Sequence, residues 1–224
     1  MPALITELID KLDNLELIRD QLGAILKVES SAQQALALAA NRDAKPWDLR
    51  VYVERTAPWE QWLDMPAEDD VAPIVAVSFE NDTSDQAGSS AVQLQRTVAT
   101  FNIDCYGYGV ATETADGHEP GDLRATAATH RAVRMVRNIL MAGHYTYLAM
   151  RGVVGKRYFQ GKTMFVPEFD SNAAQQIVAC RMNLQVEFNE YTPQVIAEPL
   201  ELLTVEVKRD PSGEVLLTAE YGDS

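Results

Sequence analysis

The fold is decided by residues 122–141, which read DLRATAATHRAVRMVRNILM. At about 100° per residue, small and aliphatic residues gather on one helix face, and arginines gather on the opposite face. The first face holds Ala125, Ala128, Ala132, Val136 and Ile139, and the second holds Arg124, Arg131, Arg134 and Arg137. We predict a helix from Leu123 to Met141, capped by Asp122, that packs closely on a sheet.

The charge around this helix is segregated from the rest of the chain. No Asp or Glu occurs between Asp122 and Glu168, a segment with eight of the 19 basic residues. The other 11 basic and all 33 acidic residues leave a net charge of -22 elsewhere, which disfavours nucleic-acid binding. The pattern fits a head-to-tail contact between identical subunits and, equally well, a solvated cationic helix face. The predicted interface residues are Arg124, Arg131, Arg134, Arg137, Arg151 and Arg157.

The composition is that of an ordinary globular protein, with 46% hydrophobic and 23% charged residues in 224. No apolar run approaches the roughly 18 residues of a membrane span, and the N-terminus has no signal-peptide pattern. Cys105 and Cys180 lie in strand-like runs with no metal-type spacing. We therefore expect buried free thiols and synthesis in a reducing cytoplasm.

The first third of the chain predicts helix followed by strand. Apolar residues recur at helical spacing from Leu4 to Leu22 and again from Ala32 to Ala40. These stretches form one long bent helix or a helix pair, which ends before Pro46. Alternation over residues 49–55 then predicts a strand.

Two tryptophans, Trp59 and Trp62, follow in a loop bounded by prolines. Side chains of this size either plug the edge of the local core or anchor a partner, since aromatic residues dominate interface hot spots. We favour the core plug, and we keep both tryptophans as candidate partner anchors.

The middle of the chain predicts two strands, at residues 73–79 and 92–106, the second with a bulge near Arg96-Thr97. Gly107-Tyr108-Gly109 is expected to end the second strand. Residues 81–90 and 110–121 are expected to be loops.

After the arginine-bearing helix, residues 145–150 predict a short helix or strand, and residues 152–166 predict a hairpin turning at Gln160-Gly161-Lys162. Residues 177–188 alternate as a long strand. The expected fold class is α+β. It comprises a mixed or antiparallel sheet, an N-terminal helix or helix pair, a central helix at 122–142 and a C-terminal β-hairpin.

The C-terminal hairpin is predicted from two alternating runs that flank Asp210-Pro211-Ser212-Gly213, a sequence that favours a turn. A proline-bearing linker at 192–199 separates it from the rest of the chain. We expect a body at 1–198 and an extension at 199–224 that adds strands to its own sheet or to a neighbour's.

Few residues suggest catalysis or ligand binding. His118, His130 and His144 form no zinc-type ligand pair. The segment from Gly155 to Thr163 has the wrong glycine spacing for a phosphate-binding loop, and a hairpin turn explains it better. We predict no enzyme activity, no cofactor and no metal site.

Besides the order of its predicted elements, the chain contains several distinctive short segments. They are PWEQW at 58–62, IDCYGYG at 103–109, RMVRNILM at 134–141, YTYL at 145–148 and FNEYTPQ at 188–194. Together they resemble the tail terminator (tail completion) proteins of tailed bacteriophages, particularly those with contractile tails. The resemblance covers most of residues 1–198, and the C-terminal hairpin is not part of the pattern in the smaller members.

The resemblance implies a structural virion protein that forms a hexameric ring. Such a ring sits on the last layer of the tail tube, ends its growth and offers a joining surface to neck and head-completion proteins. In a contractile tail it also engages the sheath. Genomic DNA would pass through the lumen without specific binding, helped by an acidic lining. No membrane is implied.

Two alternatives stay open at this point. One is another neck component, such as a head-closure or connector protein, which shares small size, acidity and ring symmetry. The other is an enzyme or ligand-binding domain. Its pocket would be formed by the Trp59/Trp62 loop and the acidic loop at 116–119.

Overall fold

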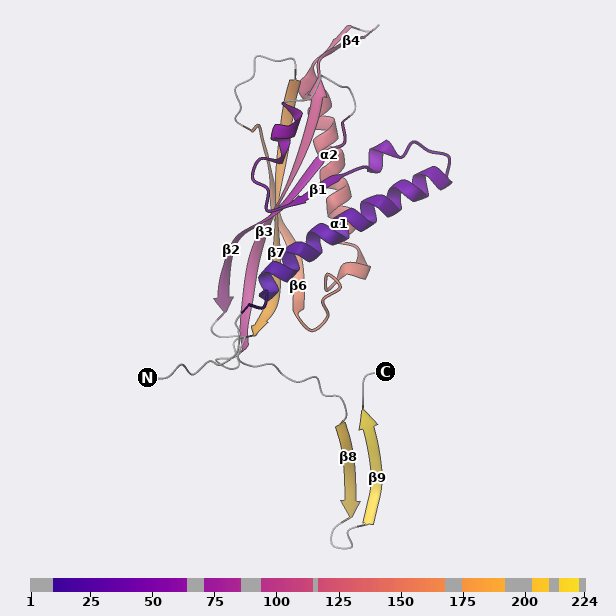
Figure 1. Cartoon of the computed structure of the whole chain (residues 1–224), viewed down its shortest axis with the longest axis vertical. Coiled ribbons are helices and arrows are strands. Elements are labelled where there is room, and N and C mark those ends of the chain that lie inside the picture. Colours follow the sequence, from indigo (N-terminus) through magenta and orange to yellow (C-terminus); the bar gives the residue numbers. More distant parts are fainter. Residues whose placement is uncertain are drawn as a thin grey trace, which may run out of the picture. The chain divides into compact units, whose positions relative to one another are not determined.

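The computed structural model describes residues 10–63, 71–85, 94–114, 117–167, 175–191, 203–209 and 214–221. The chain divides into two compact units, Met1–Tyr191 and Thr192–Ser224. The first is an α+β body and the second contains a β-hairpin, so the predicted fold class is confirmed (Figure 1). The predicted linker at 192–199 and the boundary at 198 lie outside the described residues.

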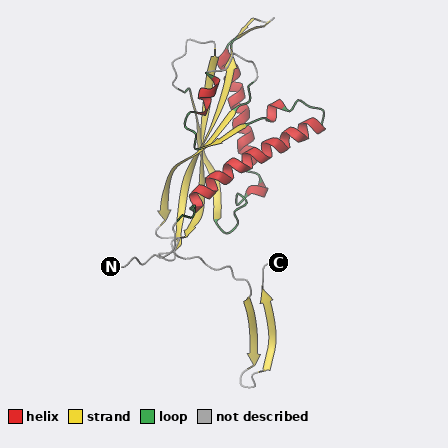
Figure 2. Cartoon of the chain, viewed as in Figure 1, coloured by secondary structure: helices red, strands yellow, loops and turns green. Residues whose placement is uncertain are grey.

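The body is built on a five-stranded sheet with the order β1-β2-β3-β7-β6. Its strands are β1 (Arg50–Val53), β2 (Ile74–Asp85), β3 (Leu94–Val110), β6 (Val154–Phe165) and β7 (Gln175–Tyr191). The sheet is mixed, because β1 runs parallel to β2 whereas the other neighbouring strands are antiparallel. Figure 2 shows the twist that long strands of this kind accumulate.

Both long helices, α1 (Asn14–Ala39) and α2 (Gly121–Leu140), pack on the same face of the sheet. The shorter elements are η1 (Lys45–Trp47), η2 (Pro58–Trp62), η3 (Gly143–Tyr145), β4 (Thr112–Thr114) and β5 (Gly117–Glu119). The main core lies between the helices and the sheet, where Leu22 and Leu26 of α1 and Val136 of α2 meet Phe101 and Leu184. A smaller cluster on the opposite face surrounds Trp62.

Within the described residues, the N-terminal segment forms one helix, α1, rather than a helix pair. Asp13 caps α1 through a capping box with Glu16, since each side chain accepts a hydrogen bond from the other residue's backbone N–H. The helix ends at Ala39, and beyond the cap residue the left-handed backbone of Asn41 (φ 53°) lets Arg42 N–H donate to Ala37 O at 2.9 Å. The predicted helical residues Leu4 and Leu8 lie outside the described residues.

Gly107 and Gly109 do not end a strand, as the sequence had suggested, because β3 continues through both residues to Val110. They lie where α2 crosses β3. A Cβ on Gly107 would lie 2.2 Å from Ala125 O, and one on Gly109 would lie 2.2 Å from Gly121 O. The two glycines are therefore required for the close approach of helix to strand.

The predicted bulge at Arg96-Thr97 is wrong, because β3 pairs with β7 without a register shift. The shift lies in β2, between Phe79 and Asn81. The alternation of β3 is imperfect because this central strand is buried over residues 99–109 on both faces. The predicted loop at 81–90 is likewise wrong for residues 81–85, which belong to β2.

The hairpin predicted at 152–166 is also wrong, because β6 is a single strand that pairs with β7 along its length. Extra residues at Gly155 and Gln160 interrupt that pairing as bulges, so the glycine-containing run is absorbed without a turn. Residues 145–150 form η3 and turns rather than a regular helix or strand.

The C-terminal hairpin is confirmed, with β8 (Leu203–Arg209) antiparallel to β9 (Glu214–Tyr221). The predicted turn at 210–213 lies outside the described residues. Cys105 and Cys180 are buried free thiols, as expected, and the β3–β7 register places them opposite each other. Burial raises the pKa of both thiols, which keeps them protonated and unreactive.

Candidate subunit interface

Helix α2 separates a buried face from a cationic face, as the sequence predicts. Its buried residues are Gly121, Ala125, Thr129, Ala132, Val133, Val136 and Leu140. Arg134 and Arg137 are exposed, whereas Arg124 and Arg131 are half-buried. We call these four side chains the arginine face. The single hydrogen of the Thr129 hydroxyl is shared between Ala125 O and Val178 O, at 2.9 and 2.8 Å, and this contact ties α2 to β7 of the sheet.

The predicted N-cap of α2 is wrong by two residues. The N-cap is Pro120, which offers no side-chain acceptor, and Asp122 lies in the first turn. Its carboxylate accepts a hydrogen bond from Leu123 N–H at 2.8 Å. Asp122 still places a negative charge at the positive end of the helix dipole.

The N-terminal half of the arginine face borders a groove of about 470 Å³. Tyr108, Gly109 and Val110 of β3 form one wall, and α2 forms the other. On the helix wall, Leu123, Arg124 and Arg131 line the groove. Arg124 faces Glu119 across it, with 3.5 Å between Nε and the carboxylate. The groove thus combines two guanidinium groups, one carboxylate and several apolar side chains.

Arg131 is a groove arginine with a buried donor atom. Its Nε atom is buried and forms no hydrogen bond within the part of the chain that the structure describes. A buried donor left unpaired costs about 1–3 kcal/mol, so such donors in native proteins are almost always paired. An acceptor from outside the described residues, either a water molecule or a carboxylate, would pair with it.

Leu123 is a groove residue that the sequence analysis missed. It is 59% exposed although it lies on the best-packed helix of the body. On a helical wheel it lies among the arginines and far from the buried face, and this position was the available signal. An exposed leucine beside two guanidinium groups gives the arginine face an apolar contact point.

Arg157, by contrast, is used within the subunit. Its guanidinium donates to Leu140 O, Ala142 O and Thr146 O at 2.6, 2.9 and 2.7 Å, which closes the C-terminal end of α2. Burial lowers the pKa of this guanidinium. Arg157 is therefore engaged within the subunit by three hydrogen bonds, and its role at an interface stays a prediction.

Arg151 is exposed, and its guanidinium lies 5.9 Å from the centre of the Tyr147 ring. Tyr147 is itself partly exposed. Arg151 and Tyr147 extend the cationic surface beyond α2, in the loop that Arg157 holds in place. The role of Arg151 at an interface stays a prediction.

The two tryptophans differ in exposure. Trp62 is 1% exposed and packs against Tyr108, with 5.4 Å between ring centres, so its assignment as a partner anchor is wrong and the core-plug interpretation is confirmed. Trp59 is half-buried against the same cluster. Its role as an anchor stays a prediction.

The described residues offer little for catalysis. His118 contacts Glu113 at 2.9 Å in an exposed position, and His130 and His144 are also exposed. Among these residues, no three His, Cys, Asp or Glu side chains gather in a way that could hold a metal ion. None of the helices in the described ranges has the length and apolar character needed to cross a membrane.

Comparison of the sequence with protein-family models and with curated proteins found no match. The arginine face, its groove and the fold that positions them are therefore the basis for a functional proposal.

Proposed function

We propose that this protein is a tail terminator subunit of a tailed bacteriophage. Copies form a ring, of six subunits by resemblance, on the last layer of the tail tube. The ring ends tube elongation and presents a joining surface to the neck, and in a contractile tail it contacts the sheath. The protein acts by assembly and not by catalysis.

The observation that carries the proposal is the arginine face with its groove. A ring requires that one side of each subunit recognise a different side of its neighbour. The groove offers two guanidinium groups, one with a buried donor that no described residue satisfies. The chain outside residues 123–167 has a net charge of -22, so an identical neighbour is rich in the carboxylates that would fit.

The α+β body is consistent with the proposal, because a helix fixed rigidly on a sheet presents its arginines in a constant geometry. The close contact at Gly107 and Gly109 and the bonds of Thr129 supply that rigidity. Rigid presentation lowers the entropy cost of repeating the same contact around a ring.

The test of the interface is the double variant Arg131→Glu, Arg134→Glu. The monomer should keep its secondary structure, because both residues lie off the buried face of α2. Ring assembly should fail, since carboxylates would then face carboxylates. The matched control is Lys11→Glu, Lys162→Glu, which makes the same charge change at exposed sites away from the groove. Normal rings from the arginine double variant would remove this face from the interface.

The test of the function is electron microscopy of particles from a phage that lacks the gene. Overlong or ragged tails separated from filled heads are expected. Tails of normal length with unjoined heads would instead assign the protein to head closure. Intact, infectious particles would overturn the structural role altogether.

A further inference from the structure

Strand β6 is an open edge of the five-stranded sheet. It pairs with β7 on one side, and on its other side the described residues contribute only an isolated bridge between Arg151 and Val154. An edge strand presents a row of backbone N–H and C=O groups that can pair with a further strand. The opposite edge strand, β1, has four residues whereas β6 has twelve, so β6 is the edge with room for a partner.

Part of this edge is regular, exposed and apolar. We call residues 161–165 the edge segment, because they pair with β7 without a register shift. The first four residues of the edge segment are exposed. Tyr158 and Met164 of β6 are 43% and 40% exposed, and Val166, directly after the strand, is 65% exposed. Apolar side chains on an exposed edge strand favour strand addition, because a further strand would cover them.

The edge is also positively charged, since β6 contains Lys156, Arg157 and Lys162 and no acid. Lys156 Nζ lies 2.9 Å from the Glu187 carboxylate, and Arg157 donates to carbonyls of its own subunit. Lys162 is exposed and forms no ion pair with any described residue. Edge lysines and the two bulges of β6 hinder pairing with a chance strand. A strand that joins the edge segment therefore needs a carboxylate for Lys162.

The hairpin of β8 and β9 has the complementary properties. A two-stranded hairpin is at best marginally stable alone in water, so it gains from a further surface. Residues 199–224 contain six acidic and two basic residues. Both basic residues belong to β8, whereas β9 contains Glu214 and Glu220 and no basic residue. The charge of β9 therefore fits Lys162, and its eight residues are enough to span the edge segment.

We propose that β9 of one copy adds as a strand to the β6 edge of a second copy. Backbone hydrogen bonds to the edge segment hold the added strand, and a carboxylate of β9 pairs with Lys162. The hairpin belongs to a compact unit of its own, and residues 192–202 join β7 to β8. These eleven residues span at most about 40 Å when fully extended, which is enough to reach a neighbouring subunit.

The contact is head-to-tail, because the hairpin of one copy meets the β6 edge of the next. It rests on the proposed ring, in which each subunit has a neighbour on both sides. Two copies of a chain with a net charge of -14 repel each other. The edge segment and the arginine face both lie in the acid-free part of the chain, so acids of a neighbour at these two places would offset the repulsion.

Hydrogen–deuterium exchange of the full chain tests the contact, read from peptides that cover residues 158–166. The outward amides of an unpaired edge exchange readily, and a strand added to β6 would protect them. Their exchange should be about tenfold slower at about 1 mM protein than at about 1 μM, because weak contacts between copies are populated only at the higher concentration. Leu217→Pro removes a backbone donor from β9 and should abolish this protection. Lys162→Glu should abolish most of it, whereas the matched control Lys11→Glu makes the same charge change at an exposed site outside the sheet and should retain it.

Amides that stay unprotected at the higher concentration, or protection that Leu217→Pro leaves unchanged, would overturn the contact. Protection that is equal at both concentrations and is removed by Leu217→Pro would assign the hairpin to the sheet of its own chain, and would overturn the second copy as its partner. Equal losses from Lys162→Glu and Lys11→Glu would remove Lys162 from the contact.

The outcome separates this inference from the proposed function. Overlong tails from the gene deletion combined with unprotected β6 amides would leave the terminator role standing and remove the hairpin from the interface. Concentration-dependent protection combined with intact particles would support strand addition as self-association and overturn the terminator role.

Discussion

The two long helices share one face of the sheet and hold to it in different ways. Helix α2 lies against β3 at two glycines, and its polar surface is cationic. Helix α1 packs mainly through its first half, and its last third is uncharged and, apart from Ala37, at least partly exposed. Packing and surface chemistry are thus divided between the helices, since α2 fixes the arginine face and α1 offers a neutral surface.

The largest effect is expected where α2 meets β3. Gly107→Ala would place a Cβ 2.2 Å from a backbone oxygen of α2, which can move only if the helix moves. We expect a loss of about 3 kcal/mol in the free energy of unfolding, measured by urea denaturation.

The equivalent change in α1 is Gly23→Ala, whose Cβ would meet the Val53 side chain at 2.6 Å. That methyl group can rotate away, and alanine improves helix propensity by about 1 kcal/mol, so the net change should stay within about 1 kcal/mol. Gly161→Ala has nothing within 4 Å and serves as the control. Equal losses at Gly107 and Gly23 would mean that the two helices pack alike.

The next largest loss in the free energy of unfolding is expected at the C-terminal end of α2. Arg157 donates to three carbonyls at the end of α2 and in the loop after it, whereas α1 has no basic residue in its last turn. Arg157→Leu should lower the free energy of unfolding by about 2 kcal/mol. Arg157→Lys keeps the charge without the planar fork and should recover only part of that loss. Full recovery by lysine would show that charge alone matters there.

Arg157 also shows where sequence reasoning stops. The acid-free stretch and the amphipathic pattern of α2 could be predicted from the sequence, because charge counts and helical spacing need no tertiary information. Arg157 turns inward because it binds backbone carbonyls that lie 11 to 17 residues away in the sequence. Only the folded loop brings these carbonyls close to its guanidinium. The same limit applies to Gly107 and Gly109, since a glycine that admits a helix and one that ends a strand look identical in sequence.

The unpredicted strand extensions have a related cause. Polar residues of β2 at 81–85 gain strand structure from pairing with β3, and β6 stays one strand through its bulges because β7 continues beside it. Tertiary pairing thus overrides local propensity. Leu123 was the exception, because its place among the arginines could have been read from the helical period.

A smaller effect is expected at the N-terminal ends. Asp13→Ala removes the capping box of α1 and should cost about 1 kcal/mol in the free energy of unfolding. The counterpart on α2 is Asp122→Ala, which removes a first-turn charge but no cap and should cost about 0.5 kcal/mol. Asp13→Asn keeps an acceptor and is the control, expected within a few tenths of a kcal/mol of the parent. A larger loss at Asp122 than at Asp13 would contradict the assignment of the caps.

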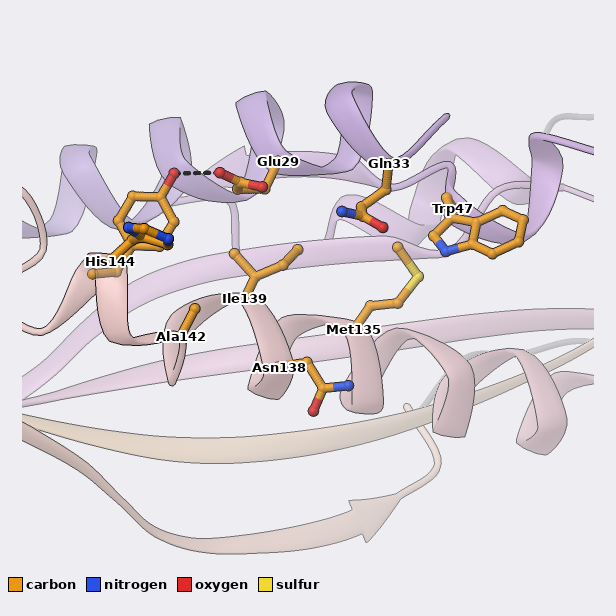
Figure 3. Close-up of a pocket in the computed structure, with 9 residues that line it drawn as sticks. Glu29, Gln33, Trp47, Met135, Asn138, Ile139, Ala142 and His144 are labelled. Carbon is orange, nitrogen blue, oxygen red and sulfur yellow. Dashed lines mark hydrogen bonds between the residues drawn. The ribbon is translucent and has the colours of Figure 1, made fainter. Parts of the chain in front are cut away.

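The smallest effect is expected at the hydrogen bond that links the two helices, drawn as a dashed line in Figure 3. The Tyr145 hydroxyl, just after α2, donates to Glu29 of α1, and this hydrogen bond, together with burial and the charge of Glu29, raises the pKa of Tyr145. Tyr145→Phe should cost about 0.5 kcal/mol at pH 8, measured by urea denaturation, and Tyr147→Phe should cost nothing.

The pH dependence of this link follows from the sign of the shift. Because folding raises the pKa of Tyr145 above its ordinary value of about 10, the contribution is complete below pH 10 and is lost as the pH rises through the folded-state value. The difference between parent and Tyr145→Phe should therefore shrink above pH 10. A difference that stayed constant from pH 8 to strongly alkaline pH would show that the ring, and not the hydroxyl, links α1 to α2.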